Sequence, residues 1–106
     1  MSNAEAIESD VTYIKPRHLG ASRVAYDLYW TAKGILDQAP GDCSCGVVVS
    51  NHAEGAKLMT EVEARLVEII DQHSSLYDIE LIDVATTRVK HGKWAVIARL
   101  SRPPRP

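Results

Sequence analysis

The chain contains only two cysteines, Cys43 and Cys45, and no phenylalanine. Two cysteines with one residue between them are too few for a disulfide framework and are compatible with a reducing compartment. No apolar run approaches the length that a membrane-spanning helix needs, and residues 1–10 lack the basic and hydrophobic regions of a signal peptide. These absences predict a cytoplasmic protein without membrane contact.

The remaining composition is that of an ordinary globular domain, with 45% apolar and 25% charged residues among 106. A chain of this length holds one domain and lies near the size at which oligomerisation often adds stability. We therefore predict a flexible acidic tail over 1–10, a single domain over 11–102, and a basic, proline-rich tail over 103–106. The domain is expected to form a homodimer.

Positive charge is unevenly distributed along the sequence. Residues 84–106 contain six Lys or Arg and no Asp or Glu, although the whole chain has a formal charge of −2. The segment 11–83 instead carries six basic and eleven acidic residues. Affinity for a polyanion should therefore come from one defined surface and be moderate in strength.

The first half of the chain predicts two strands around a helix. Alternating apolar residues over Val11–Ile14, followed by Pro16, predict a short strand. Apolar residues at helical spacing predict a helix over Ala21–Gln38, with Ser22 as its N-cap. The apolar run Gly46–Ser50 predicts a central strand that is buried on both faces.

The second half predicts a helix and a hairpin. Asn51 can cap a helix with the inward stripe Leu58, Met59, Val62, Leu66, Ile69 and Ile70, and Ser74 ends it. Two alternating segments over Ile79–Arg102 predict strands joined by a tight turn at His91-Gly92. The order β-α-β-α-β-β predicts an α/β (α+β) two-layer sandwich, with a four-stranded mixed sheet and both helices on one face.

The basic hairpin is the candidate nucleic-acid site. Side chains around its turn can reach phosphates, and Lys15 and Arg17 lie at a strand-to-helix junction of the kind that binds phosphate. Basic residues on edge strands also prevent edge-to-edge association, which is the alternative explanation. The predicted contacts are Lys15, Arg17, Arg88, Lys90, Lys93, Arg99 and Arg102.

Tyr13-Ile14-Lys15-Pro16 and the basic turn Thr87–Lys93, followed by the alternating strand Trp94–Leu100, resemble Alba-type chromatin and RNA-binding proteins. The end of the chain is also similar to the C-terminal domain of bacterial translation initiation factor three, which binds ribosomal RNA. The resemblance covers about residues 11–102 and implies a nucleic-acid-binding fold. Before the second helix Alba proteins have a Gly-Arg-Gly-like turn, where this chain has Ser50–Glu54.

No catalytic motif is complete, so no enzyme activity and no cofactor are predicted. His52-Ala53-Glu54 resembles the His-x-Glu of zinc deaminases, but no Pro-Cys-x-x-Cys follows it, and Glu54 fits a capping role. Cys43 and Cys45 are too few to hold a structural zinc ion, and one of them is expected to be buried and the other to lie in a loop. A metal or redox role for them, together with a histidine, is the least favoured alternative.

A non-enzymatic nucleic-acid-binding module, for RNA or DNA, is therefore the predicted function. The rival prediction is a small oligomeric domain that binds a ligand or protein through its exposed sheet face and a patch formed by Tyr26 and Trp30, with no role in nucleic-acid binding. Tyr26 and Trp30, one turn apart on the first helix, are the predicted oligomer contact, with burial at the edge of the domain as the alternative.

Overall fold

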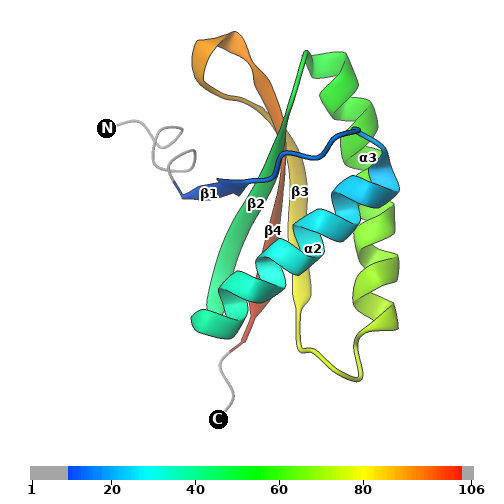
Figure 1. The fold of residues 1–106 in the computed structure, drawn as a ribbon, viewed down its shortest axis with the longest axis vertical. Helices are drawn as coiled ribbons and strands as arrows, with labels where there is room; N and C mark the ends of the chain where they lie inside the picture. The colour runs from blue at the N-terminus through cyan, green and yellow to red at the C-terminus, as the bar shows by residue number, and fades with distance from the viewer. Residues whose placement is uncertain (1–9, 104–106) are drawn as a thin grey trace.

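The computed structural model describes residues 10–103, so the predicted tails 1–9 and 104–106 lie outside the described residues. Its elements are β1 (Val11–Tyr13), α2 (Ala21–Gln38), β2 (Gly41–Val49), α3 (His52–Gln72), β3 (Glu80–Arg88), the short turn η1 (Lys90–Gly92) and β4 (Trp94–Arg102). The strands form one mixed sheet in the order β1-β2-β4-β3, and both helices pack against it (Figure 1). The predicted fold class is confirmed.

Three of the four strands run in the same direction. β1 is parallel to β2, whereas β4 is antiparallel to both β2 and β3. The carboxyl ends of β1, β2 and β3 therefore meet at one end of the sheet. Because α2 follows β1 and α3 follows β2, both helices also begin at that end.

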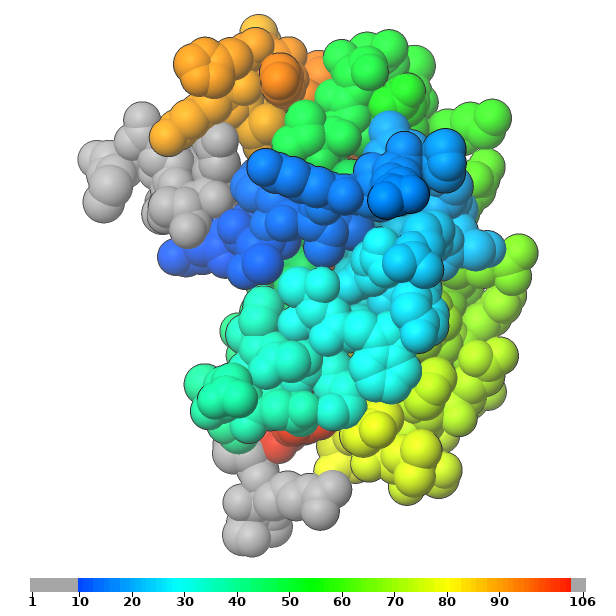
Figure 2. All heavy atoms as spheres, viewed as in Figure 1, coloured from blue at the N-terminus to red at the C-terminus, as the bar shows by residue number. Residues whose placement is uncertain are grey.

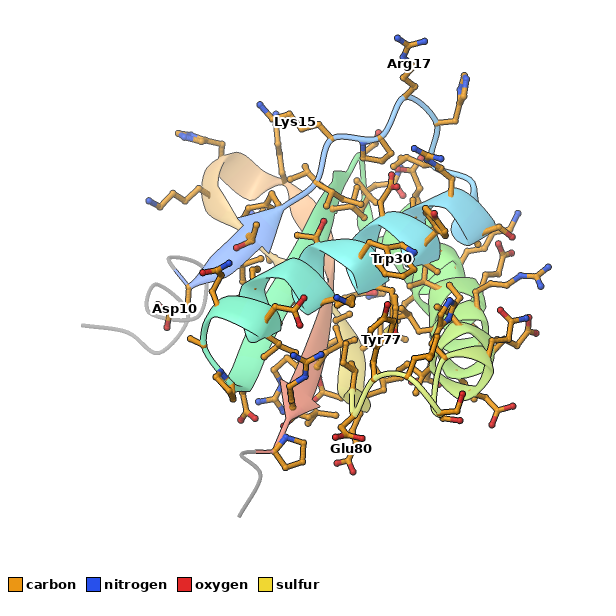
Figure 3. The ribbon with its side chains drawn as sticks, turned by 60° about the horizontal axis from the view of Figure 1, so that its bottom comes forward. Asp10, Lys15, Arg17, Trp30, Tyr77 and Glu80 are labelled. Carbon is orange, nitrogen blue, oxygen red and sulfur yellow. The ribbon has the colours of Figure 1, made fainter. Side chains whose placement is uncertain are left out.

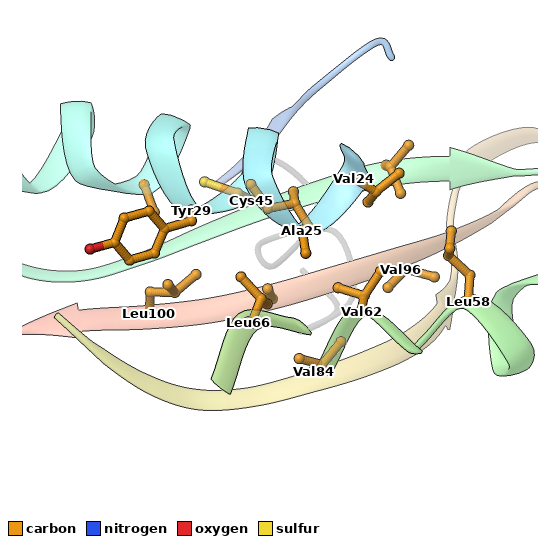
Figure 4. Close-up of a cluster of buried hydrophobic side chains, with 14 of the residues drawn as sticks. Val24, Ala25, Tyr29, Cys45, Leu58, Val62, Leu66, Val84, Val96 and Leu100 are labelled. Atoms are coloured by element: carbon orange, nitrogen blue, oxygen red, sulfur yellow. The ribbon is translucent and has the colours of Figure 1, made fainter. Parts of the chain in front are cut away.

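The hydrophobic core lies between the helices and one face of the sheet (Figure 4). On β4 alternate residues face the helices, and Val96, Ala98 and Leu100 are completely buried there. The predicted stripe of α3 supplies Leu58, Val62 and Leu66 as buried residues, with Met59, Ile69 and Ile70 at the margin. Within residues 10–103, no helix lies against the opposite sheet face (Figure 1).

Two local predictions were wrong. Ser22 is not the N-cap of α2, because Gly20 holds that position and no side chain caps the helix. β2 begins at Gly41 rather than Gly46, and it is interior to the sheet but covered on one face only, since Val48 remains 40% exposed. The apolar run from Gly46 therefore marks a strand in the interior of the sheet, with helices packed on only one of its faces.

A β-bulge in β3 decides which residues face the core. Leu81 pairs with Leu100 and Asp83 pairs with Arg99, so that Ile82 is the extra residue between them. Without the bulge, strict alternation would turn Val84 toward solvent. With it, Leu81 and Val84 both face the helices, and Asp83 is brought opposite Arg99 on the uncovered face.

Candidate nucleic-acid interface

Three loops follow the parallel strands at one end of the molecule: residues 14–20, 50–51 and 89–93. They contain four Lys or Arg and no Asp or Glu. Figure 3 shows Lys15 and Arg17 at this end, and in Figure 2 the first loop and the β3–β4 turn occupy the same half of the surface. We call the three loops, together with Arg88 at the end of β3, the basic end.

The β3–β4 turn projects Lys90 and Lys93 from the sheet. His91 has φ 63° and Gly92 has φ 70°, so both central residues adopt the left-handed conformation that a tight hairpin turn requires. The turn is closed by hydrogen bonds from Lys93 N to Lys90 O and from Val89 N to Lys93 O. The prediction of a turn at His91-Gly92 is confirmed, and Arg88, Lys90 and Lys93 are all exposed around it.

The loop between β1 and α2 forms a shallow hollow of about 420 Å³ lined by Lys15, Pro16, Arg17, His18, Arg23 and Asp27. No acidic residue lies in the first turn of α2, and no side chain caps it, so its first amide groups add positive potential. Arg23 pairs with Asp27 at 3.3 Å. His18 and Arg23 were not among the predicted contacts, although Arg23 comes three residues after the helix cap.

The structure does not group Arg99 and Arg102 with the other five predicted contacts. Arg99 lies midway along β4, where its Nε donates to both carboxylate oxygens of Asp83 at 3.0 and 3.2 Å. This hydrogen bonding lowers the pKa of Asp83. Arg102 is at the opposite end of β4 and binds Asp37, whose pKa is lowered by hydrogen bonds from Lys33 and Arg102.

The end opposite the basic end is acidic. Exposed carboxylates lie where α2 and α3 end and where β2 and β3 begin: Asp37, Asp42, Asp71, Asp78 and Glu80. Figure 3 shows Glu80 at the far side of the molecule from Lys15 and Arg17. Because the carboxyl ends of both helices also lie there, the side-chain charges and the helix dipoles have the same polarity.

The uncovered sheet face has a hollow of about 420 Å³ near its centre, lined by Asp10, Ser44, Asp83, Ala85, Thr87, Ile97 and Arg99. Its apolar members include Ile97, which is only 5% exposed. The polar groups are the hydroxyl groups of Ser44 and Thr87, the Arg99–Asp83 ion pair and the carboxylate of Asp10. This hollow favours the rival prediction, in which the uncovered sheet face binds a ligand.

The predicted aromatic pair is divided between the surface and the interior. Tyr26 is 49% exposed, whereas Trp30 packs edge-to-face against Tyr29, His73 and Tyr77. His73 caps the end of α3, and its Nδ1 lies 2.9 Å from the carbonyl oxygen of Ile69, so this histidine has a packing and capping role. Trp30 thus packs mainly against residues of its own domain. The oligomer contact remains a prediction, and Tyr26 is the exposed member of the pair that could form it.

Glu54 acts as a helix-capping residue. Asn51 Oδ1 accepts a hydrogen bond from Glu54 N at 2.9 Å, and Glu54 Oε1 accepts one from Ser50 N at 3.0 Å. His52 is exposed and packs against Trp94 with ring centroids 4.7 Å apart. Over residues 10–103 no three His, Cys, Asp or Glu side chains gather in a group that could hold a metal ion.

The chain matches no protein-family model and no curated protein. Neither of the two helices in the described part of the chain is long and apolar enough to cross a membrane. The inference about function therefore depends on the geometry and charge of the basic end.

Proposed function

We propose that this protein is a non-enzymatic nucleic-acid-binding module that contacts phosphate groups with its basic end. The observation that carries the proposal is the convergence of Lys15 and Arg17 with Arg88, Lys90 and Lys93 from segments far apart in sequence. The uncapped amino terminus of α2, which has no acidic residue in its first turn, reinforces the positive potential there. An Alba-like relationship is part of this proposal and is supported by the element order and the basic turn.

The charge distribution also suits a protein that is acidic overall. A polyanion that approaches the basic end meets the cations of its loops first, while a cluster of exposed carboxylates lies at the opposite end. Contacts to phosphate position a protein on nucleic acid without reading its sequence. We therefore assign a phosphate-contacting role to Lys15, Arg17, Arg88, Lys90 and Lys93, and we assign no base specificity.

The direct test is fluorescence anisotropy with labelled single-stranded RNA, duplex RNA and duplex DNA at several salt concentrations. We expect micromolar or tighter binding at low salt that weakens steeply as salt rises, because phosphate contacts release counterions. The double variant K90A/K93A should flatten the log–log salt dependence by roughly one unit for each phosphate that the hairpin no longer neutralises.

A charge-matched control is K33A/R65A, which removes two positive charges from α2 and α3 outside the three loops. Its salt slope should stay close to that of the wild type. If the salt dependence of binding were unchanged in K90A/K93A, the hairpin would not contact phosphate groups. No binding to any of the three nucleic acids at low salt, by a protein that circular dichroism shows to be folded, would refute the proposal.

The second candidate function is ligand binding on the uncovered sheet face, favoured by the hollow around Ile97 and Arg99. Like many small-molecule sites, the hollow combines apolar lining residues with a few polar side chains that can donate or accept hydrogen bonds. The substitution Ala85→Leu would fill this hollow from β3. Under the nucleic-acid proposal that variant should bind nucleic acid with wild-type affinity.

A further inference from the structure

Cys43 and Cys45 lie on the same face of β2, because side chains two residues apart in a strand point the same way. Both face α2. Cys45 belongs to the core and is completely buried, as Figure 4 shows, while Cys43 is partly buried at the core margin. The expectation that one cysteine would lie in a loop was wrong, since β2 begins two residues before Cys43.

The two thiols differ in their surroundings. A hydrogen bond from the Cys45 thiol lowers the pKa of Cys43, and the same interaction, together with burial, raises the pKa of Cys45. The Cys43 thiol also points toward the carbonyl oxygen of Ala32 on α2, at 4.0 Å. Cys43 is therefore the more accessible sulfur of the pair, and Cys45 is shielded from water.

Strand geometry favours a bridging ion over a disulfide bond. Residues i and i+2 of a strand are about 6.6 Å apart at Cα, close to the upper limit of about 6.8 Å for a disulfide, and their Cβ atoms run parallel. A disulfide also requires the sulfurs to approach to about 2.05 Å. With metal–sulfur bonds of about 2.3 Å, the length of a zinc–thiolate bond, an ion bound to both sulfurs needs them no more than about 4.6 Å apart.

We propose that Cys43 and Cys45 form a two-coordinate thiolate site for a soft monovalent metal ion, with Cu(I) as the cation. Thiolates bind Cu(I), zinc and iron–sulfur clusters, but structural zinc and the clusters are held by four ligands, which leaves Cu(I) as the cation that suits two. Among the described residues no His, Asp or Glu completes a three-ligand group with the cysteines, which disfavours zinc. On binding, two thiol protons pass to solvent, two metal–sulfur bonds form, and no group changes oxidation state.

The test uses the full chain, reduced and kept free of oxygen, with Cu(I) supplied through a chromogenic Cu(I) chelator that reports what the protein withdraws. We expect one copper per chain by native mass spectrometry, two sulfur neighbours per copper by X-ray absorption, and a raised Tm for the copper-loaded protein. Zn²⁺ added in place of copper should not raise the Tm.

The controls are C43S, C45A and the swap C43S/S44C. The swap keeps two cysteines in the chain but places them on opposite faces of β2. Each should lose copper affinity at least about tenfold, and Cys45→Ala avoids burying a hydroxyl group in the core. C43S and the swap keep Cys45 and alter only the margin of the core, so they remain informative if C45A unfolds.

Equal copper affinity in the wild type and the swap would overturn the proposal. So would copper held between two chains at half an equivalent per chain. Loss of two hydrogens in mass, with no copper bound, would also overturn it, because the pair would then be a disulfide-forming couple.

Discussion

Gly55 of α3 lies against Thr86 of β3 so closely that a Cβ atom at position 55 would fall 2.6 Å from Thr86 Cγ2. The second neighbour, Val49 Cγ2, would be 3.2 Å away. Glycine at this position lets the first turns of α3 approach the sheet beside the basic end. We expect Gly55→Ala to lower the free energy of unfolding by about 1–3 kcal/mol through overpacking, as measured by urea denaturation.

Gly34 of α2 is the matched control for that substitution. A Cβ there would have no neighbour within 4 Å, and the residue is exposed within a helix. Gly34→Ala should therefore raise the free energy of unfolding by about 0.5–1 kcal/mol. If Gly55→Ala and Gly34→Ala changed the free energy of unfolding by similar amounts in the same direction, the close packing of α3 on β3 would be contradicted.

The Asp83–Arg99 pair should make stability depend on pH. Because the pKa of Asp83 is lower in the folded than in the unfolded protein, its contribution is present above the unfolded value, near pH 4. The contribution is lost as pH falls through the folded pKa. D83N should cost up to about 1 kcal/mol at pH 7, a modest effect for an exposed pair, and progressively less at strongly acidic pH as Asp83 becomes protonated.

Urea unfolding of the wild type, D83N, R99Q and the double variant at neutral and at strongly acidic pH measures this dependence. The two single variants should lose similar stability at pH 7, and the double variant should lose less than their sum. A cost of D83N that stays constant from neutral to strongly acidic pH would exclude the ion pair as its cause.

The hairpin turn offers a second pair of opposed substitutions. His91 has φ 63°, in the left-handed region that glycine adopts without strain, so His91→Gly should stabilise the protein by up to about 1 kcal/mol. Gly92 has φ 70°, and Gly92→Ala should cost about 1–2 kcal/mol. Thermal unfolding measures both, and a destabilised His91→Gly protein would argue against a left-handed residue at 91.

The loop between β1 and α2 should contribute to binding independently of the hairpin. K15A/R17A is expected to flatten the salt dependence of nucleic-acid binding by roughly one unit for each phosphate that the loop no longer neutralises. Arg102→Ala serves as the control, because Arg102 binds Asp37 at the opposite end and should change stability rather than the salt slope. An equally flattened slope in the two proteins would mean that net charge, rather than the basic end, determines binding.

Periodicity predicted the elements whose apolar residues repeat regularly. The helix over Ala21–Gln38 has the predicted bounds, and Asn51 caps α3 as expected, because a helix stripe and a capping side chain are local features. The bulge at Ile82 was not predictable in the same way. It depends on pairing with β4, a long-range interaction that decides whether Val84 or Asp83 faces the helices.

The candidate site was predictable as a set of residues but not as an arrangement. Lys15 and the hairpin were singled out from charge alone, yet their common location follows from the parallel direction of β1, β2 and β3. Arg99 and Arg102 look equivalent to them in sequence. Their acidic partners, Asp83 and Asp37, lie 16 and 65 residues away, a separation that no local pattern indicates.

The opposition of a basic and an acidic end gives the protein an electric dipole that its net charge of −2 conceals. In the field of a polyanion, a molecule with this dipole rotates during diffusion before it touches the polymer. Encounters would then be productive more often than random orientation allows, and the association rate constant would fall steeply with ionic strength. A protein that is weakly acidic as a whole would thus approach another acidic polymer in one preferred orientation.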